Sequence, residues 1–199
     1  MDTSTKQLVL ASASPRRRDL LGILGIPFDV VPSDVNEDVS EAAATPGAFV
    51  RAAAMLKAEE VARTTRTGVV LGADTIVHVD GEILGKPTSL ADAARMLRRL
   101  SGRTHQVLTG VAVIEMLGGR PIGRFEDHVE TDVRFRKLSP EIIAAYLDTG
   151  EPMDKAGAYG IQEKGSLLVD GIVGCFYNVV GLPLSRVAEM LEVVGLKAL

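Results

Sequence analysis

Residues 8–25 read LVLASASPRRRDLLGILG, and this stretch joins the end of one predicted strand to the start of a predicted helix. The apolar run LVLA stops at small hydroxyl residues. Ser14 followed by Pro15 is typical of a helix N-cap with proline at the first helical position. The apolar residues that follow have helical spacing. We therefore predict a strand over Leu8–Ala11 that leads into a helix over 15–24.

Three arginines, Arg16, Arg17 and Arg18, fall in the first turn of this helix, where the positive end of the helix dipole disfavours basic side chains. A strand that runs into a helix N-terminus is also a ready anion site, because free backbone N–H groups and the dipole both point at the ligand. The glycine pattern of a P-loop or a Rossmann fingerprint is missing. On this motif alone, an anion site and a solvated surface turn remain equal alternatives.

The composition limits the class of protein. The chain has 199 residues, of which 46% are hydrophobic, a net charge of −4 and a single cysteine, Cys175. Such a chain can bury a substantial core, and we expect a single domain over 1–199. We also expect a cytoplasmic protein without a nucleic-acid or membrane partner. The histidines His78, His105 and His128 lack zinc-site spacing, and we place the first two in the sheet.

Strand patterns and helix patterns alternate along the chain. The strand patterns lie at 8–11, 28–31, 69–79, 104–114, 123–135, 167–169 and 174–180. The helix patterns cover 15–24, 46–63, 89–100, 139–148 and 183–194. Asp80-Gly81 and Gly118-Gly119 are hairpin turn signals. Hairpins within strand–helix alternation predict an α/β fold with a mixed β-sheet and flanking helices.

Asp74 lies in a strongly apolar strand pattern, VVLGADTIVHVDGEILGKP at residues 69–87. An unpaired carboxylate is costly to bury, so such a residue has to be paired, bound to a metal or poised for chemistry. The alternative is a bulge at GAD, in which Asp74 bonds to the backbone locally. The hairpin can bring Lys86 to the same side of the sheet. We favour the functional interpretation.

A long glycine-rich segment, TGEPMDKAGAYGIQEKG, covers residues 149–165. Long structured loops in compact domains are usually functional. Gln162 carries both donors and an acceptor, which suits the edge of a nucleotide base. Taken alone, however, an ordinary glycine-rich connection is the favoured interpretation of this segment.

Five segments of the chain, taken together and in order, carry a resemblance. They are LASASPRRRDLL, LGADTIVHVDGEILGKP, SGRTHQVLTGVAV, DKAGAYGIQ and YNVVGLPL. They resemble the Maf family of nucleoside triphosphate pyrophosphatases, and the match runs from about residue 8 to about residue 185. The segment AGAYGIQ is similar to the branch of the family that acts on dTTP and UTP.

The resemblance implies an α/β fold related to the inosine triphosphate pyrophosphatases, with two lobes around a nucleotide cleft. It implies hydrolysis of a nucleoside triphosphate between the α- and β-phosphates, which yields the monophosphate and pyrophosphate. A divalent metal cation, Mg or Mn, is the implied cofactor, and a homodimer is plausible by family similarity. The implied role is house-cleaning of the nucleotide pool.

The resemblance also assigns the contacts to the substrate. Ser14, Arg16 and Arg17 fall at the substrate-binding motif, where the arginines would hold the triphosphate. Arg16 also matches a position tied to substrate choice in the pyrimidine branch, and so do Thr75 and Gln162.

The same resemblance assigns the catalytic and metal residues. Asp74 matches the proton acceptor, and charged positions of the family's site match Glu37, Lys57, Lys86 and Lys155. Glu37 and Asp74 would supply carboxylates to the metal, while the lysines would neutralise charge on the leaving pyrophosphate. The sequence cannot separate a base from a metal ligand at Asp74. Many relatives have an acidic residue in place of Asn36, and this departure favours Glu37 as the carboxylate.

Two other functions remain open. One is a pyrophosphatase for purine or other modified nucleotides. The other is a nucleotide-binding regulator of cell division. The presence of Asp74, Lys86 and Lys155 favours catalysis over a pure binding role.

Overall fold

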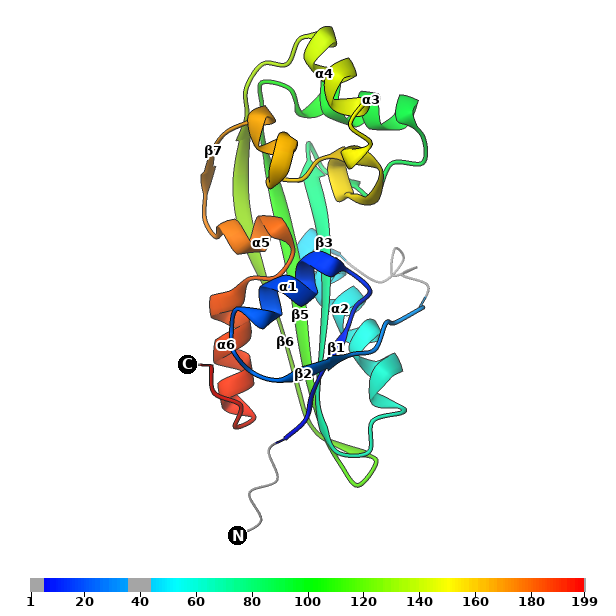
Figure 1. Cartoon of the computed structure of the whole chain (residues 1–199), viewed down its shortest axis with the longest axis vertical. Helices are drawn as coiled ribbons and strands as arrows, with labels where there is room; N and C mark the ends of the chain where they lie inside the picture. The colour runs from blue at the N-terminus through cyan, green and yellow to red at the C-terminus, as the bar shows by residue number, and fades with distance from the viewer. Residues whose placement is uncertain (1–5, 36–43, 199) are drawn as a thin grey trace. The chain divides into compact units, whose positions relative to one another are not determined.

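The computed structural model describes residues 6–35 and 44–198, and in them strands alternate with helices as predicted (Figure 1). The strands are β1 (Leu8–Ala11), β2 (Phe28–Val30), β3 (Gly68–Val79), β4 (Glu82–Leu84), β5 (Thr104–Leu117), β6 (Arg120–Phe135) and β7 (Val169–Val173). The α-helices are α1 (Pro15–Gly22), α2 (Pro46–Ala62), α3 (Leu90–Leu100), α4 (Pro140–Leu147), α5 (Phe176–Val180) and α6 (Leu184–Val193). Three short 3₁₀ helices, η1 (Glu151–Asp154), η2 (Ala156–Ala158) and η3 (Glu163–Leu168), occupy the glycine-rich segment.

The sheet is mixed, as the hairpin signals predicted. Its hydrogen-bonded order is β2-β1-β3-β5-β6-β7, and β4 pairs with β3. β1 runs parallel to both β2 and β3, whereas β4 is antiparallel to β3 and β7 is antiparallel to β6. At the β3–β4 turn, Asp80 and Gly81 both have positive φ, 49° and 79°, as a tight two-residue hairpin requires.

Three of the described helices begin at a serine N-cap, and for α1 this cap was predicted. Ser14 caps α1 by accepting a hydrogen bond from the backbone N–H of Arg17, and Pro15 is the first helical residue. Ser89 and Ser139 cap α3 and α4 in the same way. Local chemistry therefore determines these helix starts, because the cap satisfies a backbone donor that the helix itself cannot.

The prediction of a strand at 174–180 is wrong. Phe176–Val180 forms the short helix α5, and the strand expected at 167–169 is displaced, because η3 extends to Leu168. The helical turn buries Asn178 completely, and its side-chain amide donates to Val107 O and Thr131 Oγ1, both at 2.9 Å. These partners lie far away in the sequence, so the apolar pattern of the segment could not reveal them.

The described chain falls into two compact units, each built from separate stretches of sequence. The first unit comprises Met1–Asp74, Thr109–Val129 and Gly181–Leu199, and the second comprises Thr75–Leu108 and Glu130–Val180. β3, β5 and β6 each contribute residues to both units. The expectation of a single domain over 1–199 stays a prediction.

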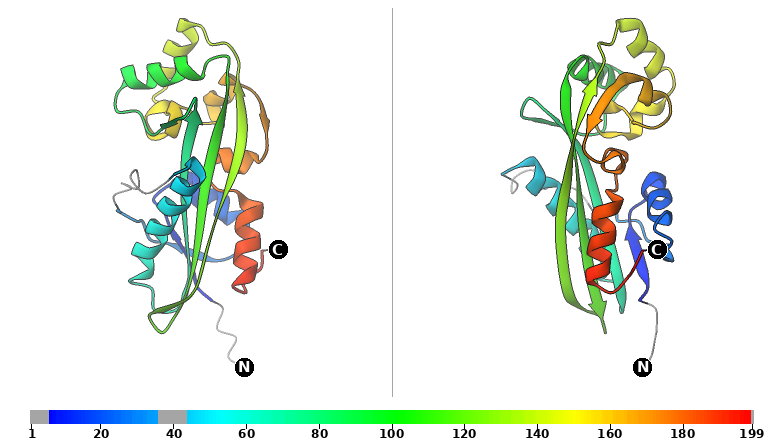
Figure 2. Two further views of the ribbon diagram at one scale, coloured as in Figure 1. Left: turned by 180° about the vertical axis from the view of Figure 1, so that it is seen from behind. Right: turned by 90° about the vertical axis from the view of Figure 1, so that its left-hand side faces the viewer.

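In the first unit, α2 covers one face of the strands and α1 and α6 cover the other (Figure 2). The core between α2 and the sheet consists mainly of small side chains. Alanines and valines dominate it, and the buried cluster consists of Val9, Ala11, Ala54, Ala58, Val61, Ala62, Val70, Ala112, Ile114 and Met116. Because these side chains are short, the backbone of α2 can lie close to the sheet.

Two glycines of the sheet allow the backbone of α2 to lie directly against the strands. A Cβ at Gly72 of β3 would collide with the carbonyl oxygen of Ala54 and lie 2.9 Å from Ala58 N. A Cβ at Gly110 of β5 would collide with Val50 O. α2 therefore packs directly on the backbone of two strands, and any side chain at either position must displace the helix.

We predict that Gly110→Ala destabilises the protein by about 1–3 kcal/mol, because the methyl group overpacks the contact with α2. The matched control is Gly22→Ala at the end of α1, where nothing lies within 4 Å of the added carbon. The control should be neutral or stabilising by up to about 1 kcal/mol. Urea denaturation measures both, and equal midpoints for the two variants would contradict the close packing.

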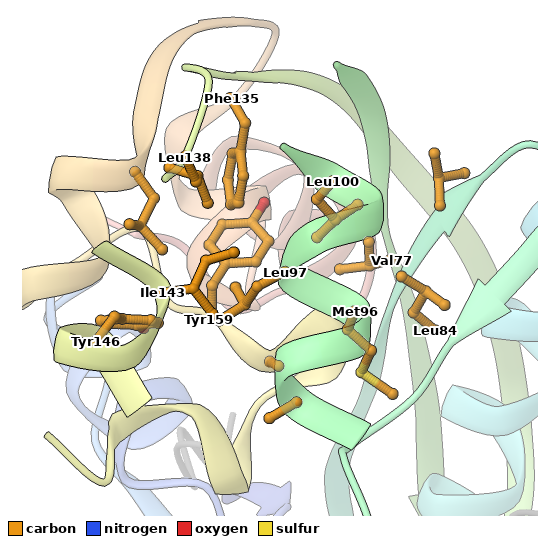
Figure 3. Packing of buried hydrophobic residues seen from close by; sticks show 14 of the residues in the cluster. Val77, Leu84, Met96, Leu97, Leu100, Phe135, Leu138, Ile143, Tyr146 and Tyr159 are labelled. Atoms are coloured by element: carbon orange, nitrogen blue, oxygen red, sulfur yellow. The ribbon is translucent and has the colours of Figure 1, made fainter. Parts of the chain in front are cut away.

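The second unit has a core of larger side chains, shown in Figure 3. Tyr159 lies there among Leu97 of α3, Ile143 of α4 and Phe135 at the end of β6. The rings of Phe135 and Tyr159 meet edge to face, with centroids 4.7 Å apart. This cluster ties the glycine-rich segment, which contains Tyr159, to the helices and strands of its unit.

His105 is buried beside this aromatic pair and is 2% exposed. Its Nε2 lies 2.7 Å from the Tyr159 hydroxyl, and its ring meets both Phe135 and Tyr159 edge to face. Burial lowers the pKa of His105 to about 4, because the charged form would lose its hydration. The placement of His78 and His105 in β3 and β5 confirms that both belong to the sheet.

The lowered pKa of His105 predicts a loss of stability in mild acid. The unfolded chain takes up a proton near pH 6.5, whereas the folded chain resists it down to about pH 4. The contribution of neutral, buried His105 to the free energy of unfolding is therefore intact above pH 6.5. At pH 5 it is lower by about 2 kcal/mol. Urea denaturation at pH 7.5 and pH 5 should show a smaller drop for His105→Gln than for the parent. An identical drop in both would contradict the buried neutral histidine.

Candidate functional site

The N-terminus of α1 is organised by hydroxyl groups. The backbone N–H of Ser14 donates to Ser12 Oγ at 3.2 Å, and the Arg17 guanidinium donates from Nη1 to the same oxygen at 3.4 Å. The Nε of Arg17 donates to Gly181 O at 2.9 Å. Arg17 therefore connects the strand–helix turn to the segment before α6, within the first unit.

The three arginines of the first turn differ in their surroundings. Arg16 and Arg17 are half-buried, whereas Arg18 is exposed and contacts the neighbouring carboxylate of Asp19 at 3.3 Å. The guanidinium of Arg17, which carries a positive charge, donates to Gly181 O and to Ser12 Oγ. The positive end of the helix dipole adds to this charge. The turn is thus suited to a phosphate group.

Lys57 and Asp74 form a buried ion pair. The Nζ of Lys57 donates to Asp74 Oδ1 at 2.7 Å, and the two residues are 9% and 6% exposed. The structure therefore brings together two residues that the resemblance assigned to catalysis. A buried carboxylate needs such a partner, since an unpaired one would be strongly disfavoured.

The geometry of this pair follows from the packing of α2 on β3. Gly72 and Asp74 are two residues apart in a strand, so they share the face that α2 covers. Ala54, Lys57 and Ala58 lie on one side of the helix, because residues three and four apart are neighbours there. The missing side chain at Gly72 lets Lys57 approach, and its amine then meets the Asp74 carboxylate.

In the second unit, the assigned residues lie on β3, after β4 and along the glycine-rich segment. Thr75 is half-buried in β3, and Lys86 is exposed just after β4. Lys155 donates from Nζ to the carbonyl oxygen of Glu151 and to Asp154 Oδ1, both at 2.7 Å. Gln162 is exposed and immediately precedes η3.

A backbone hydrogen bond joins two of these segments. Gly157 N donates to Gly85 O at 3.0 Å, so the residue before Lys86 contacts the segment that contains Lys155 and Gln162. The sequence showed these as separate motifs, and the fold makes them neighbours within the second unit.

Of the two residues predicted to hold the metal, the structure describes only Asp74, because Glu37 lies outside the described residues. Among residues 6–35 and 44–198, no three His, Cys, Asp or Glu side chains cluster as a metal site. Asp74 offers hard carboxylate oxygens, which Mg²⁺ and Mn²⁺ prefer. Mg²⁺ is commonly held by one or two carboxylates together with substrate phosphates, and the donor at Asp74 fits that arrangement.

Sequence reasoning missed two participants at the α1 turn. Ser12 is 6% exposed and accepts hydrogen bonds from Ser14 and Arg17, and Gly181 supplies its carbonyl oxygen to Arg17. The repeated serine in SAS was a usable signal for the first, since serine hydroxyls often bond to backbone N–H groups two residues away. No local signal pointed to Gly181, whose partner is 164 residues away.

The described residues thus combine a mixed α/β sheet, a basic helix N-terminus and a buried Lys–Asp pair. Residues 7–194 match the family model of the Maf-like protein. The chain is 56% identical to the dTTP/UTP pyrophosphatase of Moorella thermoacetica over 95% of both chains. It is 52% identical to that of Symbiobacterium thermophilum over 96% of this chain and 95% of the relative.

The chain therefore belongs to the Maf family. Among solved structures, a HAM1 protein from Coxiella burnetii aligns with a TM-score of 0.48 and 16% identity, over 67% of this chain and 74% of that chain. In the part of the chain that the structure describes, no helix is both long and apolar enough to cross a membrane.

We predict that Lys57→Met destabilises the protein by about 3–5 kcal/mol, because it leaves the buried Asp74 carboxylate without its cation. Adding Asp74→Asn should recover much of this loss, since the double variant removes both charges. The control is Arg124→Ala, which breaks an exposed pair with Glu59 and should cost at most about 1 kcal/mol. Urea denaturation distinguishes these cases. Equal effects of Lys57→Met and Arg124→Ala would contradict a buried pair.

Proposed function

We propose that this protein hydrolyses dTTP and UTP between the α- and β-phosphates, releasing the monophosphate and pyrophosphate. One observation carries the proposal. Asp74, the assigned proton acceptor, forms a buried ion pair with Lys57. The chain that contains this pair is 56% identical to a protein named dTTP/UTP pyrophosphatase. Modified pyrimidine triphosphates belong to the same proposed substrate class.

The first unit would bind the phosphates at the start of α1. Ser14, Arg16 and Arg17 lie at the helix N-terminus, where the positive end of the dipole favours an anion. Planar guanidinium groups match phosphate oxygens in a bidentate fashion. A bound phosphate would explain why basic side chains occupy a helix position that the dipole disfavours.

Asp74 would act on the attacking water, whose proton its carboxylate accepts. Lys57 holds Asp74 Oδ1 at 2.7 Å and thereby orients the carboxylate. Lys86 and Lys155 would stabilise the negative charge that develops on the leaving pyrophosphate. Phosphoryl transfer depends mainly on such positioning and charge neutralisation, so no covalent intermediate with the protein is needed.

We further propose a divalent cation, Mg²⁺ or Mn²⁺, held by Asp74 and Glu37 together with the substrate phosphates. When bound, it neutralises phosphate charge and polarises the phosphorus centre. In the second unit, Thr75 and Gln162 would select the base. The exposed amide of Gln162 complements the adjacent carbonyl and N–H groups that uracil and thymine share.

The proposal includes a cytoplasmic location and a role in clearing nucleotides from the pool, and a homodimer stays a prediction. Hydrolysis of purine or other modified triphosphates is the nearest alternative, which the substrate panel below distinguishes. A regulator of cell division that only binds nucleotides would bind dTTP or UTP without releasing pyrophosphate.

We expect pyrophosphate release by the parent protein to be fastest with dTTP and UTP in a panel that includes CTP and GTP at fixed Mg²⁺. Asp74→Asn should lower turnover by about 10²–10⁴, because an amide cannot accept the proton. Turnover within about threefold of the parent would reject Asp74 as base or ligand.

In the same panel, Gln162→Ala should lower kcat/KM for dTTP and UTP more than for CTP and GTP. The polar edge of the bound base would lose its partner, which typically costs about 1–3 kcal/mol. The phosphate contacts persist in this variant, so the other triphosphates are spared. An equal drop with all four substrates would move base selection away from Gln162.

A further inference from the structure

The segment from Lys155 to Gly165 is held in a strained conformation. Ala158 and Glu163, both non-glycine residues, have positive φ values of 61° and 51°. Such left-handed backbone persists only where surrounding contacts impose it. Tyr159 and Gln162 lie between these two residues, so the contacts that impose the strain also determine where Gln162 is presented.

Glycines make the packing of this segment very close. A Cβ at Gly165 would collide with Gly160 O and lie 2.7 Å from the Tyr146 hydroxyl, and one at Gly157 would lie 2.8 Å from Val77 Cγ2. The backbone N–H of Gly160 donates to the Tyr146 hydroxyl at 3.2 Å. Little room is left for the segment to adjust without losing these contacts.

Tyr159 anchors the segment through its hydroxyl, which lies 2.7 Å from His105 Nε2. Tyr159 is 5% exposed, and its ring packs against Phe135 and His105. The other ring nitrogen, His105 Nδ1, is buried with no hydrogen-bond partner among the described residues. Burying this ring nitrogen without a hydrogen bond costs stability, because the nitrogen loses its hydration. An apolar side chain at position 105 would not have this cost.

We propose that the His105–Tyr159 hydrogen bond positions the 155–165 segment for pyrimidine selection, with His105 and Tyr159 as positioning residues that act through Gln162. The polar pair is directional, so it sets one placement of the Tyr159 ring where apolar packing alone would tolerate several. Gln162 follows Tyr159 by three residues, across a backbone that the strain and close packing constrain. This inference rests on the proposed function, because it presumes that Gln162 reads the base.

The test compares three variants in the same substrate panel, with kcat/KM measured for UTP, dTTP, CTP and GTP. Tyr159→Phe keeps the ring and deletes the hydroxyl, and His105→Leu deletes the partner. Each should reduce the ratio of kcat/KM for UTP over CTP by about tenfold. His105→Gln retains a hydrogen-bonding group near the position of Nε2 and should keep the ratio within about twofold of the parent. The matched control is Tyr177→Phe, an exposed tyrosine of α5 in the same unit.

A purely structural role gives a different result. Loss of folded protein would lower kcat/KM for all four substrates by the same factor and leave their ratios unchanged. The double variant Tyr159→Phe with His105→Leu should be no less selective than either single variant, because both remove the same bond. Ratios unchanged in Tyr159→Phe, or additive losses in the double variant, would overturn the proposal.

A second measurement does not depend on catalysis. Hydrogen exchange of the amides in 157–165 should be faster in Tyr159→Phe and His105→Leu than in the parent, and unchanged in His105→Gln. If Gln162→Ala alters selectivity but Tyr159→Phe does not, the positioning role fails while the proposed function stands. If the parent releases no pyrophosphate from any triphosphate, the proposed function fails. Unchanged exchange in Tyr159→Phe would then also reject the positioning of the segment.

Discussion

The contact between α2 and the sheet is the constraint on which the first unit depends. Gly72 and Gly110 have no side chain, so the helix backbone lies directly against β3 and β5. That short separation allows Lys57 to meet Asp74 at 2.7 Å, and the helix itself covers the pair from water. A wider spacing would leave both charges buried without contact, which is the most unfavourable arrangement for either.

The second unit contains the glycine-rich segment, which side-chain packing holds in one place. Small residues permit close approach, but they contribute few apolar contacts of their own. A single large ring, Tyr159, supplies those contacts by inserting among Phe135, Leu97 and Ile143 (Figure 3). The hydroxyl of this ring then finds a buried acceptor or donor in His105. Tyr159 and its buried neighbours thus add to the backbone contacts that hold the segment.

Several helix starts and the hairpins could be predicted, because they depend on interactions between residues close in sequence. Hairpins within strand–helix alternation in turn indicated a mixed sheet. Ser14 caps α1 through the N–H of Arg17, three residues further along, and Asp80 with Gly81 forms a hairpin turn by its own backbone preferences. α5 could not be predicted, because its apolar residues are equally suited to a strand. The distant partners of Asn178 decide between the two.

The sequence by itself determined that the chain is an α/β protein and where several helices begin. It indicated that Asp74 had to be paired, bound to a metal or poised for chemistry. It also located the arginines and lysines that suit a triphosphate. Only the tertiary structure decided that the partner of Asp74 is Lys57, that Arg17 contacts Gly181, and that His105 anchors Tyr159. Capping and turn formation act over a few residues. These three contacts depend on how separate elements pack, and that packing follows from burial across the whole chain.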